Sequence, residues 1–130
     1  MAEREIIVPA GMENLYERFH YAPAVRIGNT LYISGQVGRD ENLQVIEGAE
    51  AQFTQAFENL KKVLAAAGAT LEDIFELVTY HTDMRDIPLF LEVKDRYFTR
   101  DYPTLTAIGT PALAMPGLML EIKATALLQR

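Results

Sequence analysis

Apolar and polar side chains alternate near the end of the chain, in segment 118–128. A period of two residues predicts a β-strand whose two faces differ in character. We expect one face to pack in the core, and its residues are Leu120, Ile122, Ala124, Ala126 and Leu128. The opposite face would carry Met119, Glu121, Lys123, Thr125 and Leu127.

A second alternation covers segment 31–37, and here the two faces suggest different roles. The core face would carry Leu31, Ile33 and Gly35. The other face would carry a phenol, a hydroxyl and an amide, from Tyr32, Ser34 and Gln36. Three such groups side by side are typical of a ligand site, and residue types alone fit an edge strand with one solvent-facing side equally well. A glycine inside a strand is typical of a bulge or of close approach by a ligand or another backbone, so Gly35 belongs to this candidate site.

Apolar residues at three- and four-residue steps predict two helices. The first would run from about Glu47 to Ala67 and end at Gly68, where a C-terminal cap belongs. The second would begin at Asp86, whose side chain would cap it, and would end near Thr99. Its inward face would carry Ile87, Phe90, Leu91, Lys94, Tyr97 and Phe98.

Shorter patterns predict the remaining strands, which cover 5–8, 20–27, 74–82 and 104–109. Segment 12–18 is interpreted as an irregular link. Together these elements predict one α+β domain over residues 1–130, with a six-stranded mixed sheet and both helices on one face. The other face of the sheet mixes apolar and polar groups, which suits a subunit interface lined with clefts.

Composition narrows the functional classes. The chain has 130 residues, a net charge of −6 and no cysteine. It has no cluster of lysine and arginine that would neutralise phosphates, so we expect no nucleic-acid partner. Without cysteine there is no disulfide, no thiolate nucleophile and no cysteine metal site. No signal-peptide pattern and no apolar run of ~18 residues is present, so we expect a cytoplasmic protein without a membrane partner.

A motif near the start of the chain resembles a known family. It consists of Tyr21, Pro23-Ala24-Val25, Gly28 and Ser34-Gly35-Gln36, and it resembles the opening of the RidA/YjgF (reactive intermediate deaminase) family. The resemblance extends over about residues 18–128, and segments 81–83 and 93–94 look closest to the YjgH-like branch. It implies a chorismate-mutase-like fold and a homotrimer with three clefts between subunits. It also implies that no metal or cofactor is needed.

The resemblance implies an activity and a set of site residues. Deaminating members hydrolyse 2-imino or enamine acids, and the matching glutamate, which would position or activate water, is Glu121. Tyr21 and Ser34 match substrate-binding positions. The arginine that clamps the substrate carboxylate in such members is replaced by Leu105, and Ala107 stands where a cysteine is common. An aliphatic side chain cannot supply a charge-assisted contact, which is worth about 1.5–3 kcal/mol.

Other polar residues are candidates for a replacement contact, namely Lys94, Arg26 and His81. A lysine in an apolar stripe more often extends its ammonium group to water. A lone histidine on an apolar strand is more often a structural residue. Three functions therefore remain open: a deaminase using Glu121, a trimer that binds a small metabolite without turnover, and a ribonuclease. The ribonuclease is least favoured because the chain is acidic.

Overall fold

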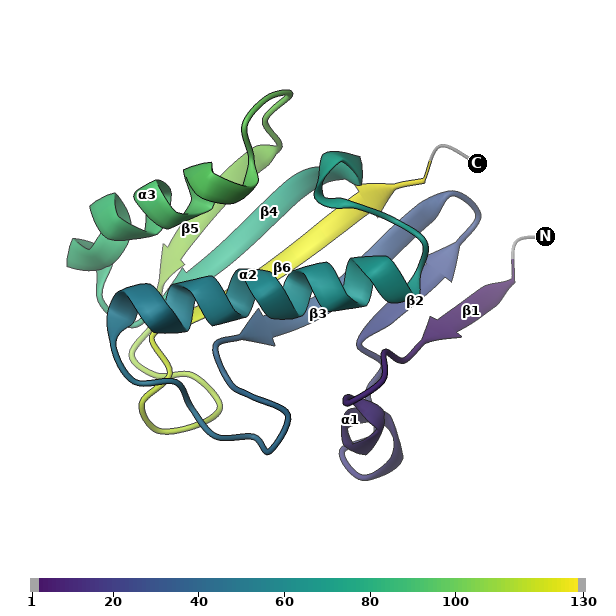
Figure 1. Ribbon diagram of the computed structural model, residues 1–130, viewed down its shortest axis with the longest axis horizontal. Coiled ribbons are helices and arrows are strands. Elements are labelled where there is room, and N and C mark those ends of the chain that lie inside the picture. The colour runs from purple at the N-terminus through teal and green to yellow at the C-terminus, as the bar shows by residue number, and fades with distance from the viewer. Residues whose placement is uncertain (1–2, 129–130) are drawn as a thin grey trace.

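The fold is built on one mixed sheet, and the computed structural model describes it over residues 3–128 (Figure 1). The strand order is β1-β2-β3-β6-β4-β5. The strands are β1 (Arg4–Ile7), β2 (Ala24–Ile27), β3 (Thr30–Val37), β4 (Ile74–His81), β5 (Thr104–Gly109) and β6 (Leu120–Leu127). The strands β4 and β5 pair in parallel, and the other neighbours pair antiparallel. The predicted α+β class and six-stranded mixed sheet are confirmed.

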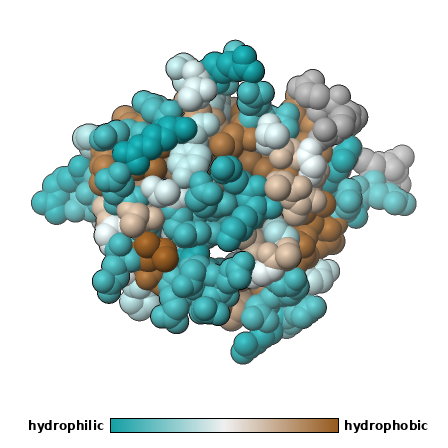
Figure 2. All heavy atoms as spheres, in the orientation of Figure 1, coloured by the Kyte–Doolittle hydropathy of each residue, from teal (hydrophilic) through white to brown (hydrophobic). Residues whose placement is uncertain are grey.

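Two long helices, α2 (Ala49–Ala66) and α3 (Ile87–Tyr97), lie across one face of this sheet (Figure 1). α2 packs on β3 and β6 and also against α3. The ring of Phe57 on α2 stacks on Phe90 and Tyr97 of α3, with centroids 5.9 and 4.9 Å apart. The even-numbered residues 120–128 are all buried beneath the helices, as the alternation predicts. Figure 2 shows that the outer side of the helical layer is mainly hydrophilic.

Several element boundaries differ from the sequence prediction. Residues Glu13–Glu17 form a short helix, α1, where an irregular link is expected. β2 begins at Ala24, because the preceding residues include Pro23 and do not pair with β3 in the ladder. A 3₁₀ turn, η2 (Met84–Asp86), precedes α3, and there the side chain of Asp83 accepts a hydrogen bond from the Arg85 N–H. A further 3₁₀ turn, η1 (Leu71–Asp73), leads into β4.

The cap and the inward face of α3 also need correction. Asp86 occupies the N-cap position, but its side chain makes no capping hydrogen bond. Leu91 is 37% exposed, whereas Val93, which the prediction omits, is fully buried. The buried face of α3 is therefore rotated about the helix axis relative to the predicted face. The side chain of Lys94 is largely buried, with 14% of it exposed.

A bulge in β3 changes which side chains share a face. Ile33 pairs with Ala124 and Gln36 pairs with Ile122, so two residues of β3 stand opposite one residue of β6. The extra residue reverses the alternation after this point. Gln36 consequently turns into the core, where it is 5% exposed, and the prediction that it lies beside Tyr32 and Ser34 is wrong. Gly35 likewise lies on the face opposite the core, not in it.

The sheet face opposite the helices has no covering layer within residues 3–128. The strand register places on this face several large apolar side chains that are 37–48% exposed, namely Ile6, Ile27, Tyr32, Ile108 and Leu127. Among them lie the polar side chains of β4 and β6. A surface of this composition is typical of a protein–protein contact.

Candidate functional site

The site is organised by Glu121, whose carboxyl group lies directly over Gly35. Glu121 is on β6, where it pairs with Val37 of β3 and Tyr80 of β4 on the sheet face opposite the helices. A methyl group built on Gly35 would lie 2.5 Å from Cδ and 2.6 Å from Oε2 of Glu121. Ordinary contacts between carbon atoms are about 3.5–4.0 Å. Gly35 is therefore required for this carboxyl position, and the close approach that its place in a strand predicts is made by the chain's own glutamate.

The environment of Glu121 suits proton transfer. Burial raises the pKa of the Glu121 carboxyl, and the positive charge of Arg39 partly opposes this shift. Within residues 3–128 the carboxyl group takes part in no hydrogen bond or ion pair, so its lone pairs are available. A half-buried carboxylate with a raised pKa is a stronger base than an exposed one, and it can accept a proton from a bound water molecule.

Ser34 forms the next part of the site, at the β3 bulge. Its hydroxyl donates a hydrogen bond of 2.6 Å to the carbonyl of Ala22, and its N–H donates to the carbonyl of Pro23. Because the hydroxyl proton is committed to the backbone, Ser34 can accept a hydrogen bond from a ligand. No histidine contacts the hydroxyl among the described residues, so the geometry gives no support to a serine nucleophile.

The residue that the sequence interpretation missed is Arg39, two positions after β3. Its Nη2 donates to the Tyr21 hydroxyl oxygen over 3.3 Å, and its charge acts on Glu121. Arg39 therefore contacts Tyr21 directly and lies near enough to Glu121 for its charge to act on the carboxyl group. The sequence shows a cation close to the strand end, but it gives no signal for the direction of a side chain in a turn.

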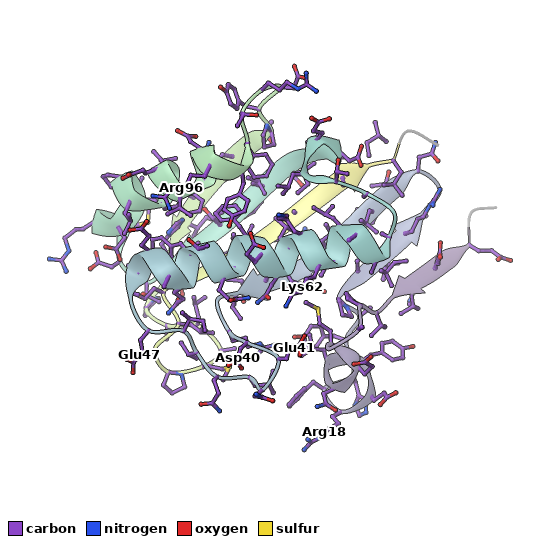
Figure 3. All side chains as sticks on the ribbon, in the orientation of Figure 1. Arg18, Asp40, Glu41, Glu47, Lys62 and Arg96 are labelled. Carbon is purple, nitrogen blue, oxygen red and sulfur yellow. The ribbon has the colours of Figure 1, made fainter. Side chains whose placement is uncertain are left out.

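The loop that carries Arg39 is held firmly. Asn59 of α2, itself buried, donates from Nδ2 to the carbonyls of Val37 and Arg39 at 2.8 Å each. A small hollow lies between this loop, the segment 10–15 and α2, and its lining includes Gly35, Arg39 and Lys62. Figure 3 shows Asp40 and Glu41 on this loop, below Lys62 of α2. The backbone that carries the Arg39 side chain is therefore fixed by hydrogen bonds to α2.

Leu105 and Ala107 lie elsewhere in the chain. On β5 they pair with Leu77 and Thr79, which are buried beneath the helices, so both lie on the helix side of the edge strand. Glu121 lies on the opposite side of the sheet. Within one chain the structure does not bring Leu105 and Ala107 to Glu121, and a common cleft would need a second subunit.

The three proposed replacement contacts also lie away from Glu121. The ammonium of Lys94 forms an ion pair of 3.0 Å with Asp95 on α3. Arg26 donates to the carbonyl of Gly28 within the β2–β3 hairpin. His81 is buried against the Phe90 ring, with Nε2 placed 2.8 Å from the Thr79 hydroxyl, and burial lowers its pKa. These contacts are structural within the chain.

Comparison with known proteins decides the family. A sequence profile described as Endoribonuclease L-PSP, which represents the RidA/YjgF proteins, matches residues 12–128. The chain belongs to the RidA/YjgF family. The RutC family protein YjgH of Escherichia coli is 39% identical over 97% of this chain and 96% of its own length. A solved structure of protein YjgH has a TM-score of 0.90 and covers 98% of both chains at 38% identity.

Another RidA/YjgF relative carries a named activity. The human 2-iminobutanoate/2-iminopropanoate deaminase is 32% identical over 82% of this chain and 79% of its own length. Within residues 3–128 no group of three acidic or histidine side chains is placed to hold a metal ion. No helix in this part of the chain combines the length and the apolar character that crossing a bilayer requires.

Proposed function

We propose that this protein is a cytoplasmic hydrolase that deaminates small imines or enamines, with Glu121 as the residue that activates water. The observation that carries the proposal is the unpaired, half-buried carboxylate of Glu121, which rests on Gly35 and has a raised pKa. The named activity of the human relative supports the same chemistry.

The reaction follows from the position of this base. Glu121 accepts a proton from water while the water oxygen bonds to the imine carbon. The protonated Glu121 passes that proton to the imine nitrogen, which gives a carbinolamine. The hydroxyl proton of the carbinolamine then moves through Glu121 to the nitrogen as the carbon–nitrogen bond breaks, so ammonia leaves with the bonding electrons and a carbonyl compound forms. An enamine first takes up a proton at carbon and loses one from nitrogen to water, and so reacts as the imine. Water is the only co-reactant, so the balance needs no metal and no redox cofactor.

We further propose that the site is completed between the subunits of a homotrimer. Leu105 and Ala107 lie on the opposite side of the sheet from Glu121, so they can line the same cleft only when they come from another subunit. The uncovered apolar side chains on the Glu121 face support a subunit contact there. Light scattering should give three times the chain mass, and a mass of 14.6 kDa would contradict this assembly.

The activity is tested by a coupled assay in which an amino-acid oxidase or dehydratase supplies the imine. We expect the protein to accelerate ammonia release, and Glu121→Gln to reduce that acceleration about 10²- to 10⁴-fold, as expected when a general base is lost. Glu92→Gln is a matched control, because Glu92 is exposed on α3 and pairs only weakly with Arg96 across 3.8 Å.

A protein that binds metabolites without turnover is the second candidate, and Leu105 in place of the family's arginine favours it. If the wild-type protein gives no rate above spontaneous hydrolysis with several imines, while it still binds the corresponding 2-oxo acids, this second function replaces the first. A ribonuclease remains the least favoured, because a net charge of −6 repels phosphate backbones.

A further inference from the structure

The guanidinium of Arg39 lies at the site with two neutral partners. Nη2 donates to the Tyr21 hydroxyl and Nη1 to the thioether sulfur of Met115, both over 3.3 Å. These are long contacts to weak acceptors, whereas a guanidinium is matched in shape and charge to a carboxylate. Among the residues that the structure describes, Arg39 forms no ion pair. Its guanidinium therefore makes no paired contact with a carboxylate in the described part of the chain.

The acidic residues closest to Arg39 in the sequence are occupied elsewhere. Asp40 accepts hydrogen bonds from the backbone N–H groups of Asn42 and Gln44, at 2.9 and 3.0 Å. Glu41 is turned toward Lys62 of α2, 4.0 Å away (Figure 3). Neither carboxylate forms an ion pair with Arg39.

We propose that Arg39 binds the anionic group of the small-molecule ligand, and so supplies the contact that Leu105 does not. The class of ligand, a small 2-imino or enamine carboxylate, rests on the proposed function. The carboxylate would take two N–H donors from the guanidinium, and the Tyr21 hydroxyl, whose oxygen already accepts from Arg39, would donate a third hydrogen bond.

The fixed backbone around Arg39 strengthens this assignment. Asn59 holds the carbonyl of Arg39 from a helix in the core, so little order has to be gained when an anion binds. Lys123 is the competing cation, because it lies on the same sheet face, opposite the β3 bulge. Lys123 is exposed, however, and a lysine does not present the paired donors of a guanidinium.

The test measures binding directly and does not require turnover. The probes are 2-oxobutanoate and its uncharged methyl ester, titrated into the intact protein by calorimetry or by ligand-observed NMR. We expect the wild-type protein to prefer the acid to the ester. Arg39→Gln should weaken binding of the acid about 10- to 100-fold, the effect of one charge-assisted contact, and leave the ester unchanged.

Two variants serve as matched controls, and a third variant preserves the charge at position 39. Arg26→Gln removes the same charge on the distant hairpin, and Lys123→Gln removes the competing cation; neither should weaken acid binding as Arg39→Gln does. Arg39→Lys keeps the charge but loses the paired donors, so we expect an intermediate affinity. This variant also keeps the test decisive if Arg39→Gln does not give the assembly of the wild-type protein.

The following outcomes overturn the assignment of Arg39 as the anion-binding residue. The proposal is wrong if wild-type protein does not bind the acid, if it binds acid and ester equally, or if the loss of affinity follows Lys123→Gln instead.

The outcomes also distinguish the role of Arg39 from the proposed deaminase function. Binding that depends on Arg39 in a protein without imine hydrolysis supports Arg39 and contradicts the deaminase. Hydrolysis that survives Arg39→Gln with unchanged acid affinity supports the deaminase and contradicts Arg39.

Discussion

Replacing Gly35 with alanine should displace the Glu121 carboxyl group without disturbing the strand. The new methyl group would lie 2.5 Å from Cδ of Glu121, and a normal contact is about 3.5–4.0 Å, so the carboxyl group has to move by roughly 1 Å or more. Gly35 does not have a left-handed backbone, so alanine is compatible with its conformation. Misplacing a reacting group by about 1 Å can cost roughly 10²-fold in rate. We expect a loss of that order in imine hydrolysis, with a cost of about 1–3 kcal/mol in folding stability at most.

The matched control is Gly109→Ala on β5. Gly109 is also a strand glycine without a positive φ, and its nearest neighbour would be the flexible side chain of Met84 at 3.2 Å. A double-mutant comparison separates displacement of Glu121 from other effects. If Gly35→Ala acts through Glu121, the Gly35→Ala/Glu121→Gln double variant should lose no more activity than Glu121→Gln alone. Wild-type rates in Gly35→Ala, or losses that multiply in the double variant, would refute the assigned geometry.

Two further predictions concern Leu105 and His81. Leu105→Arg should fold, because Leu105 is 37% exposed on the edge strand of the single chain, and it should strengthen binding of 2-oxo acids. Unchanged affinity, measured by calorimetry, would show that position 105 does not reach the ligand. His81 is buried and its pKa is lowered from 6.5, so the unfolded chain takes up a proton at a higher pH than the folded chain. Stability should therefore fall as the pH decreases below about 6.5, by at most about 1.4 kcal/mol per pH unit from this residue. Urea unfolding at fixed protein concentration should show a shallower decrease for His81→Gln, and equal slopes for the two proteins would contradict this assignment.

The alternation in β6 predicts both its core face and the place of Glu121 on the opposite face, because helices cover one face of the sheet and an unbulged strand has a period of two. The same rule fails in β3. A bulge adds one residue at Ser34 and Gly35 and so turns Gln36 into the core. The glycine marks this place in the sequence, but it cannot show whether the register shifts, because that depends on pairing with β6. The five-residue α1 is too short to produce a helical period.

Arg39 was missed for a different physical reason. Its direction depends on contacts with residues distant in the chain: Asn59 holds its backbone from α2, and Tyr21 and Met115 accept weak hydrogen bonds from its guanidinium. A local pattern can place a residue in a turn, but it cannot supply such contacts. The candidate cations chosen from the sequence lay on predicted strands and helices, where direction follows from periodicity. Lys94 was correctly placed on a covered face, and that face is on the other side of the sheet from Glu121.

The positions of Arg39 and Leu105 change what a subunit contact would contribute. An arginine at position 105 would bring the anion contact from one subunit to the Glu121 of another, since these positions lie on opposite sides of the sheet. An anion contact at Arg39 instead comes from the same chain as Glu121. Assembly would then not be needed to supply charge, but it would still shield the cleft from bulk solvent and complete the apolar wall with Leu105. A variant held as a monomer should consequently retain weak binding of 2-oxo acids that depends on Arg39, while its hydrolytic activity is lost.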